Sequence, residues 1–205
     1  DPEGEGAQRT ARPVGLREVA ALASVSTATV SRAMNAPETV SPELRRRIQM
    51  VIRETGWVPS GAARALATRR TFTVGTVFPS LAQGLFANAL DGLQDELNAR
   101  SYTLLVAHSR YSFEEERRQA IKLVERGVDG LVLEGRQRPP ELVRFLEKQN
   151  VPYVCTFVFE PDGRVPCIGP DSYRALYELT EYLIGLGHRR FGLIAQSIEG
   201  NDRAQ

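Results

Sequence analysis

The sequence changes its pattern near Thr71, and this change limits the fold more than any other feature. Before it, short helical segments follow one another between turn signals. After it, short apolar runs alternate with amphipathic helical segments. Such alternation with short loops is typical of right-handed βαβ units and an open, doubly wound parallel sheet with helices on both faces. We therefore expect an all-α unit followed by an α/β sheet unit.

Three helices are predicted in the first unit. Apolar residues at helical spacing predict one over Leu16–Ala23. The second, TATVSRAMN, follows Ser26, a good N-cap residue. The third begins at Ser41-Pro42-Glu43 and ends at Gly56, a residue typical of left-handed C-caps. Their common core is expected to contain Leu16, Val19, Val30, Ile48 and Ile52.

Five strands and four further helices are predicted in the second unit. The strands are the apolar runs FTVGTVF, YTLLVAH, DGLVLEG, PYVCTF and FGLIA. The helices cover Phe86–Arg100, Phe113–Arg126, Glu141–Gln149 and Tyr173–Leu186. The expected organisation is a disordered lead-in over residues 1–13, a helical unit over 14–58, a hinge and linker over 59–70, and the sheet unit over 71–205.

Positive charge is concentrated before residue 71. Residues 7–70 hold eleven arginines against four glutamates, whereas residues 71–205 hold fifteen Lys or Arg against eighteen Asp or Glu. This asymmetry indicates that only the first unit meets a polyanion. No apolar run approaches the roughly 20 residues of a membrane span. Cys155 and Cys167 match no zinc spacing or disulfide framework, which fits a reducing cytoplasm.

The segment LREVAALASVSTATVSRAMN carries the main functional signal. Two helices joined by a short turn can place the second helix in the DNA major groove. Its exposed face would offer Thr27, Ala28 and Arg32 to base edges, and arginine can form a bidentate pair with guanine. Short polar side chains that suit phosphate oxygens are Ser26, Thr29, Ser31 and Asn35. A helical hairpin without DNA-binding function, with an arginine on its solvent-exposed side, is an alternative that fits the same residues.

Several motifs in order resemble the lactose-repressor family of transcription regulators, from about residue 14 to the end of the chain. They are S-x-A-T-V-S-R at 26–32, V-S-P-E at 40–43, R-G-V-D-G-L at 126–131 and G-H-R-R at 187–190. The resemblance implies a homodimer on a pseudo-palindromic DNA operator, with Thr27, Ala28 and Arg32 reading bases.

The same resemblance implies that Leu66 wedges into the minor groove, from a hinge segment, Ser60–Ala67, that becomes helical on DNA. Ser60 and Gly61 depart from the family pattern, and glycine costs about 1 kcal/mol of helix propensity, so a looser hinge is expected. An ordinary linker role for Leu66 stays open.

The second unit is similar to a periplasmic-binding-protein-like sensor, which implies a small-molecule effector such as a sugar or sugar acid. Ligands of open α/β sheets lie beyond the carboxyl ends of the strands, and the expected contacts are Ser80, Gln83 and Phe86. Phe86 also suits a core position. Phe157 stands where family members often have an aspartate, which favours a less sugar-like effector. FGLIA would begin a second subdomain, and the sequence is expected to be truncated within it.

Two other classes of protein compete with an effector-controlled repressor located in the cytoplasm at the nucleoid. The first is an enzyme, for instance a nucleotide-dependent one, which would need a glycine-rich phosphate loop after the first strand, and VGTVFPSLAQG holds neither G-x-G-x-x-G nor a P-loop. No catalytic triad or metal-ligand cluster is apparent, no cofactor is implied, and His108 and His188 suit packing or surface positions. An architectural DNA binder without an effector is the second alternative.

Overall fold

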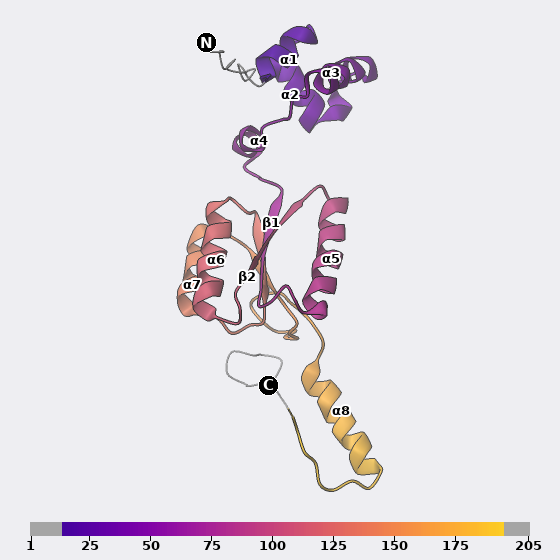
Figure 1. Cartoon of the computed structure of the whole chain (residues 1–205), viewed down its shortest axis with the longest axis vertical. Helices are drawn as coiled ribbons and strands as arrows, with labels where there is room; N and C mark the ends of the chain where they lie inside the picture. The colour runs from indigo at the N-terminus through magenta and orange to yellow at the C-terminus, as the bar shows by residue number, and fades with distance from the viewer. Residues whose placement is uncertain (1–13, 195–205) are drawn as a thin grey trace, which may run out of the picture. The chain divides into compact units, whose positions relative to one another are not determined.

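The computed structural model describes residues 14–194 (Figure 1). The chain divides into two compact units, Asp1–Ala67 and Thr68–Gln205, and each has its own buried hydrophobic cluster. The expected lead-in over residues 1–13 lies outside the described residues.

The first unit is helical, as the sequence predicts. Its elements are α1 (Leu16–Leu22), α2 (Thr27–Asn35), a 3-10 helix (Pro37–Thr39), α3 (Pro42–Thr55) and α4 (Gly61–Thr68). Local signals set the ends of these helices. The Ser26 and Ser41 side chains cap α2 and α3 by accepting hydrogen bonds from backbone N–H groups three residues later. Gly56 ends α3 with a φ of 64°, a left-handed conformation that glycine adopts without strain.

Seven buried residues form the core of the first unit: Val19, Ala20, Ala23, Val30, Ala33, Ile48 and Val51. The predicted core residues Val19, Val30 and Ile48 are fully buried, and Ile52 packs half-buried against them. The prediction for Leu16 is wrong, because its side chain is 37% exposed. Leu16 is the first residue of α1, one turn before the buried residues of that helix, and so lies at the rim of the core.

The second unit is built on a parallel sheet. Its strands are β1 (Thr73–Phe78), β2 (Thr103–His108), β3 (Gly130–Glu134), β4 (Tyr153–Thr156) and β5 (Cys167–Ile168). They lie in the order β2-β1-β3-β4-β5, and each neighbouring pair is parallel. The helices of this unit are α5 (Gly84–Ala99), α6 (Phe113–Glu125), α7 (Pro140–Gln149) and α8 (Ser172–Gly185). The predicted α/β fold class is confirmed.

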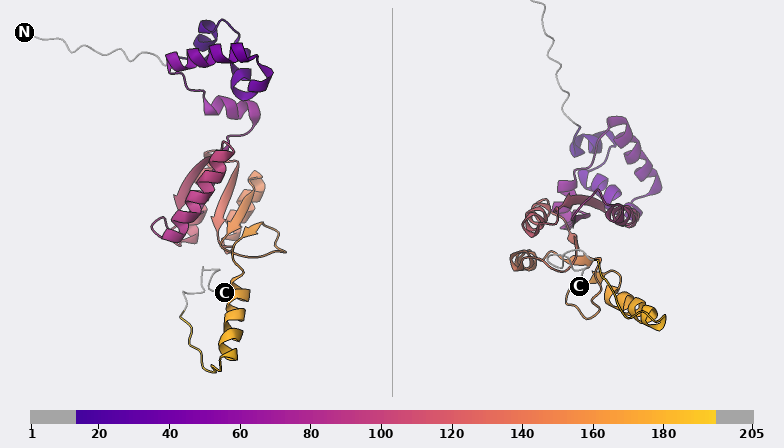
Figure 2. Two further views of the ribbon diagram at one scale, coloured as in Figure 1. Left: turned by 90° about the vertical axis from the view of Figure 1, so that its right-hand side faces the viewer. Right: turned by 60° about the horizontal axis from the view of Figure 1, so that its bottom comes forward.

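Helices cover both faces of this sheet. α5 lies on one face, and α6 and α7 lie on the other (Figure 1), and Figure 2 shows the same layers from two other sides. Buried aliphatic residues from β1, β3, α6 and α7 fill the space between the sheet and the latter two helices. Gly75 in β1 permits this packing, because a Cβ atom there would lie 2.8 Å from Leu131 Cδ2 and 3.0 Å from Leu123 Cδ1.

Two predictions for the strands are wrong. Strand β5 was not predicted, because two residues are too few for a periodic pattern. The predicted strand FGLIA is absent over residues 191–194, and Ala195 lies outside the described residues. A strand needs a neighbour that satisfies its backbone N–H and C=O groups. Residues 191–194 are not paired with any strand, and Leu193 and Ile194 are 75% and 101% exposed.

Helix α8 differs from the other helices of the second unit because it buries none of its residues. The Asp171 side chain caps it, accepting a hydrogen bond of 2.9 Å from the Arg174 backbone N–H. Its apolar side chains are exposed, namely Tyr173, Leu176, Tyr177, Leu179, Tyr182 and Ile184. Local sequence signals therefore define this helix without support from packing.

Candidate nucleic-acid interface and effector pocket

Helix α2 turns one face to the core and the opposite face to solvent. Val30 and Ala33 are buried in the core of the first unit. At 3.6 residues per turn, the opposite face holds five exposed residues: Thr27, Ala28, Ser31, Arg32 and Asn35. The structure therefore brings all three predicted base-reading residues onto one surface, together with two of the four residues predicted to contact phosphates.

Arg32 is the long cationic side chain on this face. It is exposed, and among the described residues it takes part in no ion pair. A guanidinium group has five N–H donors in a planar fork. Arg32 can therefore donate to the O6 and N7 atoms of guanine without first breaking an internal ion pair.

The short polar side chains of α2 form two pairs. Ser26 Oγ lies 2.9 Å from Thr29 Oγ1 and also caps the helix. Asn35 Nδ2 donates to Ser31 Oγ at 3.2 Å. These bonds hold the side chains in place, yet each hydroxyl keeps acceptor capacity and Asn35 keeps a second N–H donor. Contacts from this surface to phosphates remain available.

The turn between α1 and α2 fixes the direction in which α2 leaves. Ser24 adopts a left-handed conformation with a φ of 52°. The Val25 backbone N–H then donates to the Ala20 carbonyl oxygen at 2.9 Å, and Val25 packs against the core. The exposed face of α2 is thus oriented by backbone bonds as well as by its buried side.

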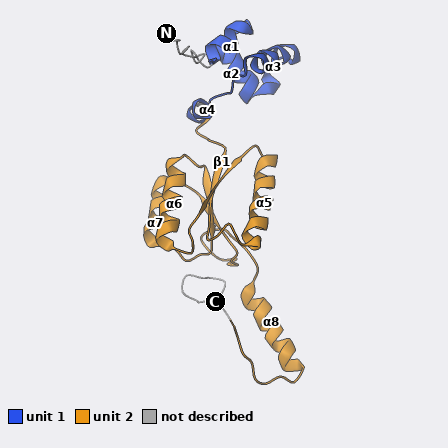
Figure 3. Ribbon diagram, viewed as in Figure 1, with its two compact units in different colours: residues 1–67 blue, residues 68–205 orange. Residues whose placement is uncertain are grey.

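Helix α4 lies at the boundary between the two units, which Figure 3 colours separately. The Ser60 side chain caps it by accepting a bond of 3.3 Å from the Ala63 N–H, and alanines that favour helix fill much of the segment. The segment is therefore helical, and helix formation on DNA stays a prediction. Leu66 is 87% exposed, so no internal contact must be broken before it contacts another surface.

The three residues predicted to contact an effector differ in their exposure. Ser80 is half-buried, and its hydroxyl accepts a hydrogen bond of 3.2 Å from the Ala82 N–H. Gln83 is exposed and occupies the N-cap position of α5. Phe86 is 0% exposed, so it occupies the core position that the sequence had left open.

Phe86 belongs to a cluster of three aromatic rings at the carboxyl end of the sheet. It stacks on Phe78, with ring centroids 5.5 Å apart, and Phe157 meets these rings edge-on at 5.4 and 6.0 Å. Phe157 is left-handed, with a φ of 63°. Gly169 fits directly against this backbone, because a Cβ atom on it would lie 2.3 Å from the Val158 nitrogen. Edge-to-face ring contacts stabilise such a cluster.

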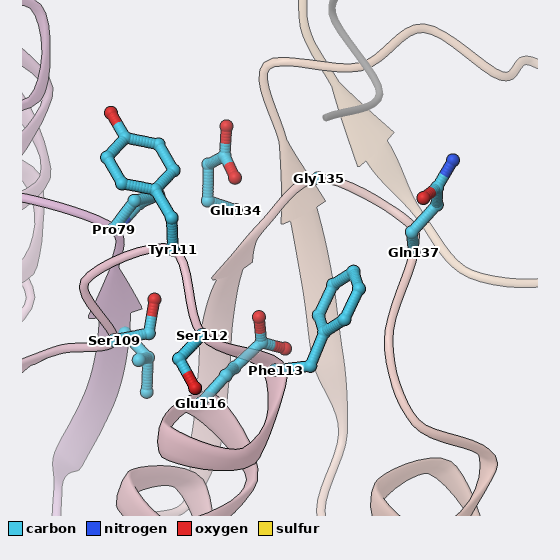
Figure 4. A pocket seen from close by; sticks show the side chains of 10 residues that line it. Pro79, Ser109, Tyr111, Ser112, Phe113, Glu116, Glu134, Gly135 and Gln137 are labelled. Atoms are coloured by element: carbon cyan, nitrogen blue, oxygen red, sulfur yellow. The ribbon is translucent and has the colours of Figure 1, made fainter. Parts of the chain in front are cut away.

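A small polar cavity of about 20 Å³ lies at the carboxyl ends of the first three strands. Figure 4 shows the polar side chains around it, which include Ser109, Tyr111, Glu116, Glu134 and Gln137. This space suits about one water molecule. These residues were not predicted, because they follow different strands, β2 and β3, whose carboxyl ends come to the same edge as that of β1 only in the folded sheet.

Glu116 in this cavity faces a buried cation. Its Oε1 atom lies 3.8 Å from Nε of Arg138, whose side chain is 2% exposed. The Arg138 guanidinium also lies over the Tyr153 ring, 5.1 Å from its centroid. Opposite charges buried together limit the cost of removing each from water. The pair therefore ties α6 to the loop after β3.

A larger cavity of about 270 Å³ lies beyond β4 and β5, close to the lower limit of about 300 Å³ for small-molecule sites. Its lining includes Arg136, Phe157, Phe159, Glu160, Asp171 and Tyr173. Arg136 Nη1 and Glu160 Oε1 are 2.5 Å apart. Aromatic faces beside an ion pair suit a ligand with both an apolar face and hydrogen-bonding groups.

The Cys155 thiol is not activated as a nucleophile. Cys155 and Cys167 are free and lie opposite each other in β4 and β5. Burial raises the pKa of the Cys155 thiol to about 11, so it stays protonated and weakly nucleophilic near neutral pH. Residues 14–194 hold no group of three or more His, Cys, Asp or Glu placed to bind a metal ion. None of the helices described is long and apolar enough to span a membrane.

Both units match known protein families. Residues 15–60 match the model of bacterial regulatory proteins of the lacI family, and residues 71–203 match that of periplasmic binding proteins and the sugar binding domain of the LacI family. Catabolite control protein A of Staphylococcus epidermidis is 31% identical over 191 residues, which cover 92% of this chain and 58% of the relative. The HTH-type transcriptional regulator CelR of Thermobifida fusca is 36% identical over 208 residues, covering 97% and 61%.

Solved structures agree with these matches. A LacI family regulator from Silicibacter pomeroyi gives a TM-score of 0.71 at 26% identity, covering 87% of this chain and 54% of that one. A lac repressor dimer bound to operator shares the fold, with a TM-score of 0.70 at 24% identity over 86% of this chain and 54% of that one. The chain thus spans somewhat more than half the length of the relatives it matches. These relatives are regulators, not enzymes. The chain belongs to the lacI family of bacterial regulatory proteins.

Proposed function

We propose that this chain binds operator DNA as part of a transcriptional repressor whose DNA affinity a small-molecule effector controls. The exposed face of α2 carries the proposal. Thr27, Ala28 and Arg32 lie together on it, opposite the buried Val30 and Ala33. A helix presented in this way, in a unit rich in arginine, has the shape and charge that fit the major groove.

Each residue of this face has a distinct role in the proposal. Arg32 reads a guanine, Ala28 offers its methyl group to a thymine methyl, and Thr27 contacts a base edge. Phosphate contacts come from the hydroxyl and amide side chains paired on α2, which are Ser26, Thr29, Ser31 and Asn35. The phosphate contacts position the helix, and the base contacts specify the sequence.

The operator is expected to be pseudo-palindromic because a symmetric homodimer presents two copies of α2 to the DNA. Leu66 from each copy enters the minor groove at the centre of the operator and unstacks one base step. Its 87% exposure supports this role, since the side chain is free for insertion.

The effector is a sugar or sugar acid held at the carboxyl end of the sheet. Strand ends in open α/β sheets converge there, and the two cavities described above lie at that edge. Phe157 stands where a carboxylate is common in the family, so the effector has an apolar face at this position and is less sugar-like than those of other members. Ser80 and Gln83 contact the effector from the β1–α5 loop, and Phe86 supports the site through its ring contacts. The protein acts in the cytoplasm, at the nucleoid.

Selection of binding sites from random double-stranded DNA tests the DNA-binding proposal. The chain should enrich a two-fold related sequence, and failure to enrich any sequence would contradict it. Sugars and sugar acids are then titrated onto the complex with the selected DNA. A change in DNA affinity with one of them supports effector control. No change with any of them favours the architectural binder instead.

A further inference from the structure

The motif R-G-V-D-G-L at 126–131 binds the two residues that precede β1, Thr71 and Phe72. Oδ1 of Asp129 accepts hydrogen bonds from the Thr71 backbone N–H at 2.9 Å and from the Thr71 hydroxyl at 3.0 Å. Oδ2 accepts a bond of 2.8 Å from the Phe72 N–H. The Thr71 hydroxyl also lies 2.7 Å from the carbonyl oxygen of Gly127. Bonds to a carboxylate are stronger than bonds between neutral groups, so one side chain fixes two consecutive linker residues.

On the other side of β1, Phe72 is also bonded to β2 and contacts the residue before it. The Phe72 carbonyl oxygen accepts a bond of 2.8 Å from the Thr103 N–H at the start of β2. The Phe72 ring meets the Tyr102 ring edge-on, with centroids 5.4 Å apart. Phe72 has a φ of 53°, an unfavourable conformation for a bulky residue. The contacts on both sides stabilise this bend in the chain.

The linker itself is ordered by local bonds. The Thr68 hydroxyl donates to the Arg70 carbonyl oxygen at 3.0 Å and lies 3.3 Å from the Arg70 N–H, from which it accepts. Arg69 between them is left-handed, with a φ of 56°. Residues 68–72 therefore form a defined turn, and the bonds of Asp129 fix its end to the sheet.

Strand β3 joins this attachment point to the small polar cavity at the carboxyl end of the sheet. Asp129 directly precedes β3, and the strand ends at Glu134, which lines the polar cavity together with Gly135. Its five residues span about 17 Å at about 3.3 Å each. The three central residues of β3 are buried, so a shift at one end of the strand moves the other end with it.

The geometry points to Asp129 as a positioning residue that sets the path of the linker toward the DNA-binding unit. Asp129 directly precedes β3, while the N–H groups that it accepts from belong to the residues before β1, so the side chain fixes the linker to two paired strands. This mechanism rests on the proposed function for its effect on DNA. The attachment itself is independent of that function.

The test compares three versions of the whole chain. Asp129→Asn keeps the shape of the side chain but replaces one of its two acceptor oxygens with an NH2 donor, so at least one of the two backbone N–H groups loses its acceptor. Thr71→Val removes the hydroxyl and leaves both backbone bonds intact, so it is the milder variant. Asp162→Asn is the matched control, since Asp162 is exposed and, within residues 14–194, makes no ion pair.

Amide hydrogen exchange by NMR and affinity for the selected operator are measured where circular dichroism shows each variant folded. Asp129→Asn should exchange the Thr71 and Phe72 amides at least about tenfold faster than the control. It should also bind operator about tenfold more weakly than the control. Thr71→Val should also speed the exchange of these amides and weaken operator binding, but by less. If Asp129→Asn does not fold, Thr71→Val alone tests the positioning role.

Exchange equal to that of the control would show that Asp129 does not hold the linker. Faster exchange with unchanged operator affinity would show a local bond without a positioning role, and would also overturn the inference. If even the unmodified chain binds no DNA, the proposed function fails. In that case a positioning role toward DNA fails with it, and the exchange data decide only whether the attachment exists.

Discussion

The two units differ in how completely each buries its apolar residues. In the first unit, α1, α2 and α3 enclose one core within about forty residues of sequence. In the second, β1, β3, α6 and α7 enclose a core, whereas α8 buries none of its residues. The structure of the first unit is therefore determined by neighbours close in sequence, while α8 depends on its own caps and helix propensity. Substitutions can test this difference directly.

The largest expected effect is on the stability of the first unit. Ile48→Ala should lower its free energy of unfolding by about 2–5 kcal/mol, because Ile48 is 0% exposed and the small core has little capacity to refill the space. Thermal unfolding followed by circular dichroism measures the change. Met50→Ala on the same helix is the control, since Met50 is 57% exposed. Equal stability of the two variants would show that the first unit lacks a tight core.

Leu66→Ser should abolish most of the DNA bend and lower operator affinity about tenfold or more, because unstacking a base step needs an apolar wedge. Gel shifts with circularly permuted operator fragments measure bend and affinity together. Leu22→Ser is the control, because Leu22 is 60% exposed on α1. Unchanged bending by the Leu66 variant would leave this leucine an ordinary linker residue.

Arg32→Ala should weaken operator binding by about 1–3 kcal/mol and relax the preference at one base pair in each half-site. The effect follows from the loss of the bidentate donor on the exposed face of α2. Binding-site selection with both proteins shows it. Arg53→Ala removes an exposed arginine from α3 and should leave base preference unchanged. The same base preference before and after Arg32→Ala would contradict base reading by this residue.

The smallest effect is expected in α8. Leu176→Ser should change the stability of the chain by no more than about 0.5 kcal/mol, because the Leu176 side chain is 49% exposed. Leu142→Ala in α7, where the leucine is 0% exposed, should cost about 2–5 kcal/mol. Chemical denaturation of both variants gives the comparison. A large loss for Leu176→Ser would show that α8 packs in solution.

The elements that the sequence predicted well are those with local signals. Caps at Ser26 and Ser41 and the left-handed Gly56 define α2 and α3 whatever surrounds them. β1 to β4 were also predicted, since apolar runs bounded by turns mark buried strands. Helix α5 begins at Gly84, two residues before its predicted start. Its N-cap position is occupied by Gln83, whose side chain makes no capping hydrogen bond, so the sequence holds no typical start signal there.

The features that were missed depend on contacts between distant residues. β5 exists because Cys167 and Ile168 pair with β4, and no pattern within two residues can show that. The polar cavity combines residues after β2 and β3, and which strand ends are neighbours follows from the order of the sheet. The attachment of Thr71 by Asp129 joins residues 58 positions apart. The motif at 126–131 was visible in the sequence, but its contact with Thr71 could be recognised only in the folded structure.

The contact between Gly169 and the backbone of Phe157 and Val158 limits how effector preference can be re-engineered. Any side chain at position 169 would collide with main-chain atoms, which move less readily than side chains. A library that varies this position would consist mostly of defective proteins. Phe159 and Tyr173 line the larger cavity, are exposed, and can be exchanged while the backbone stays in place. Useful diversity for new ligands therefore lies at these two positions, with the glycine held constant.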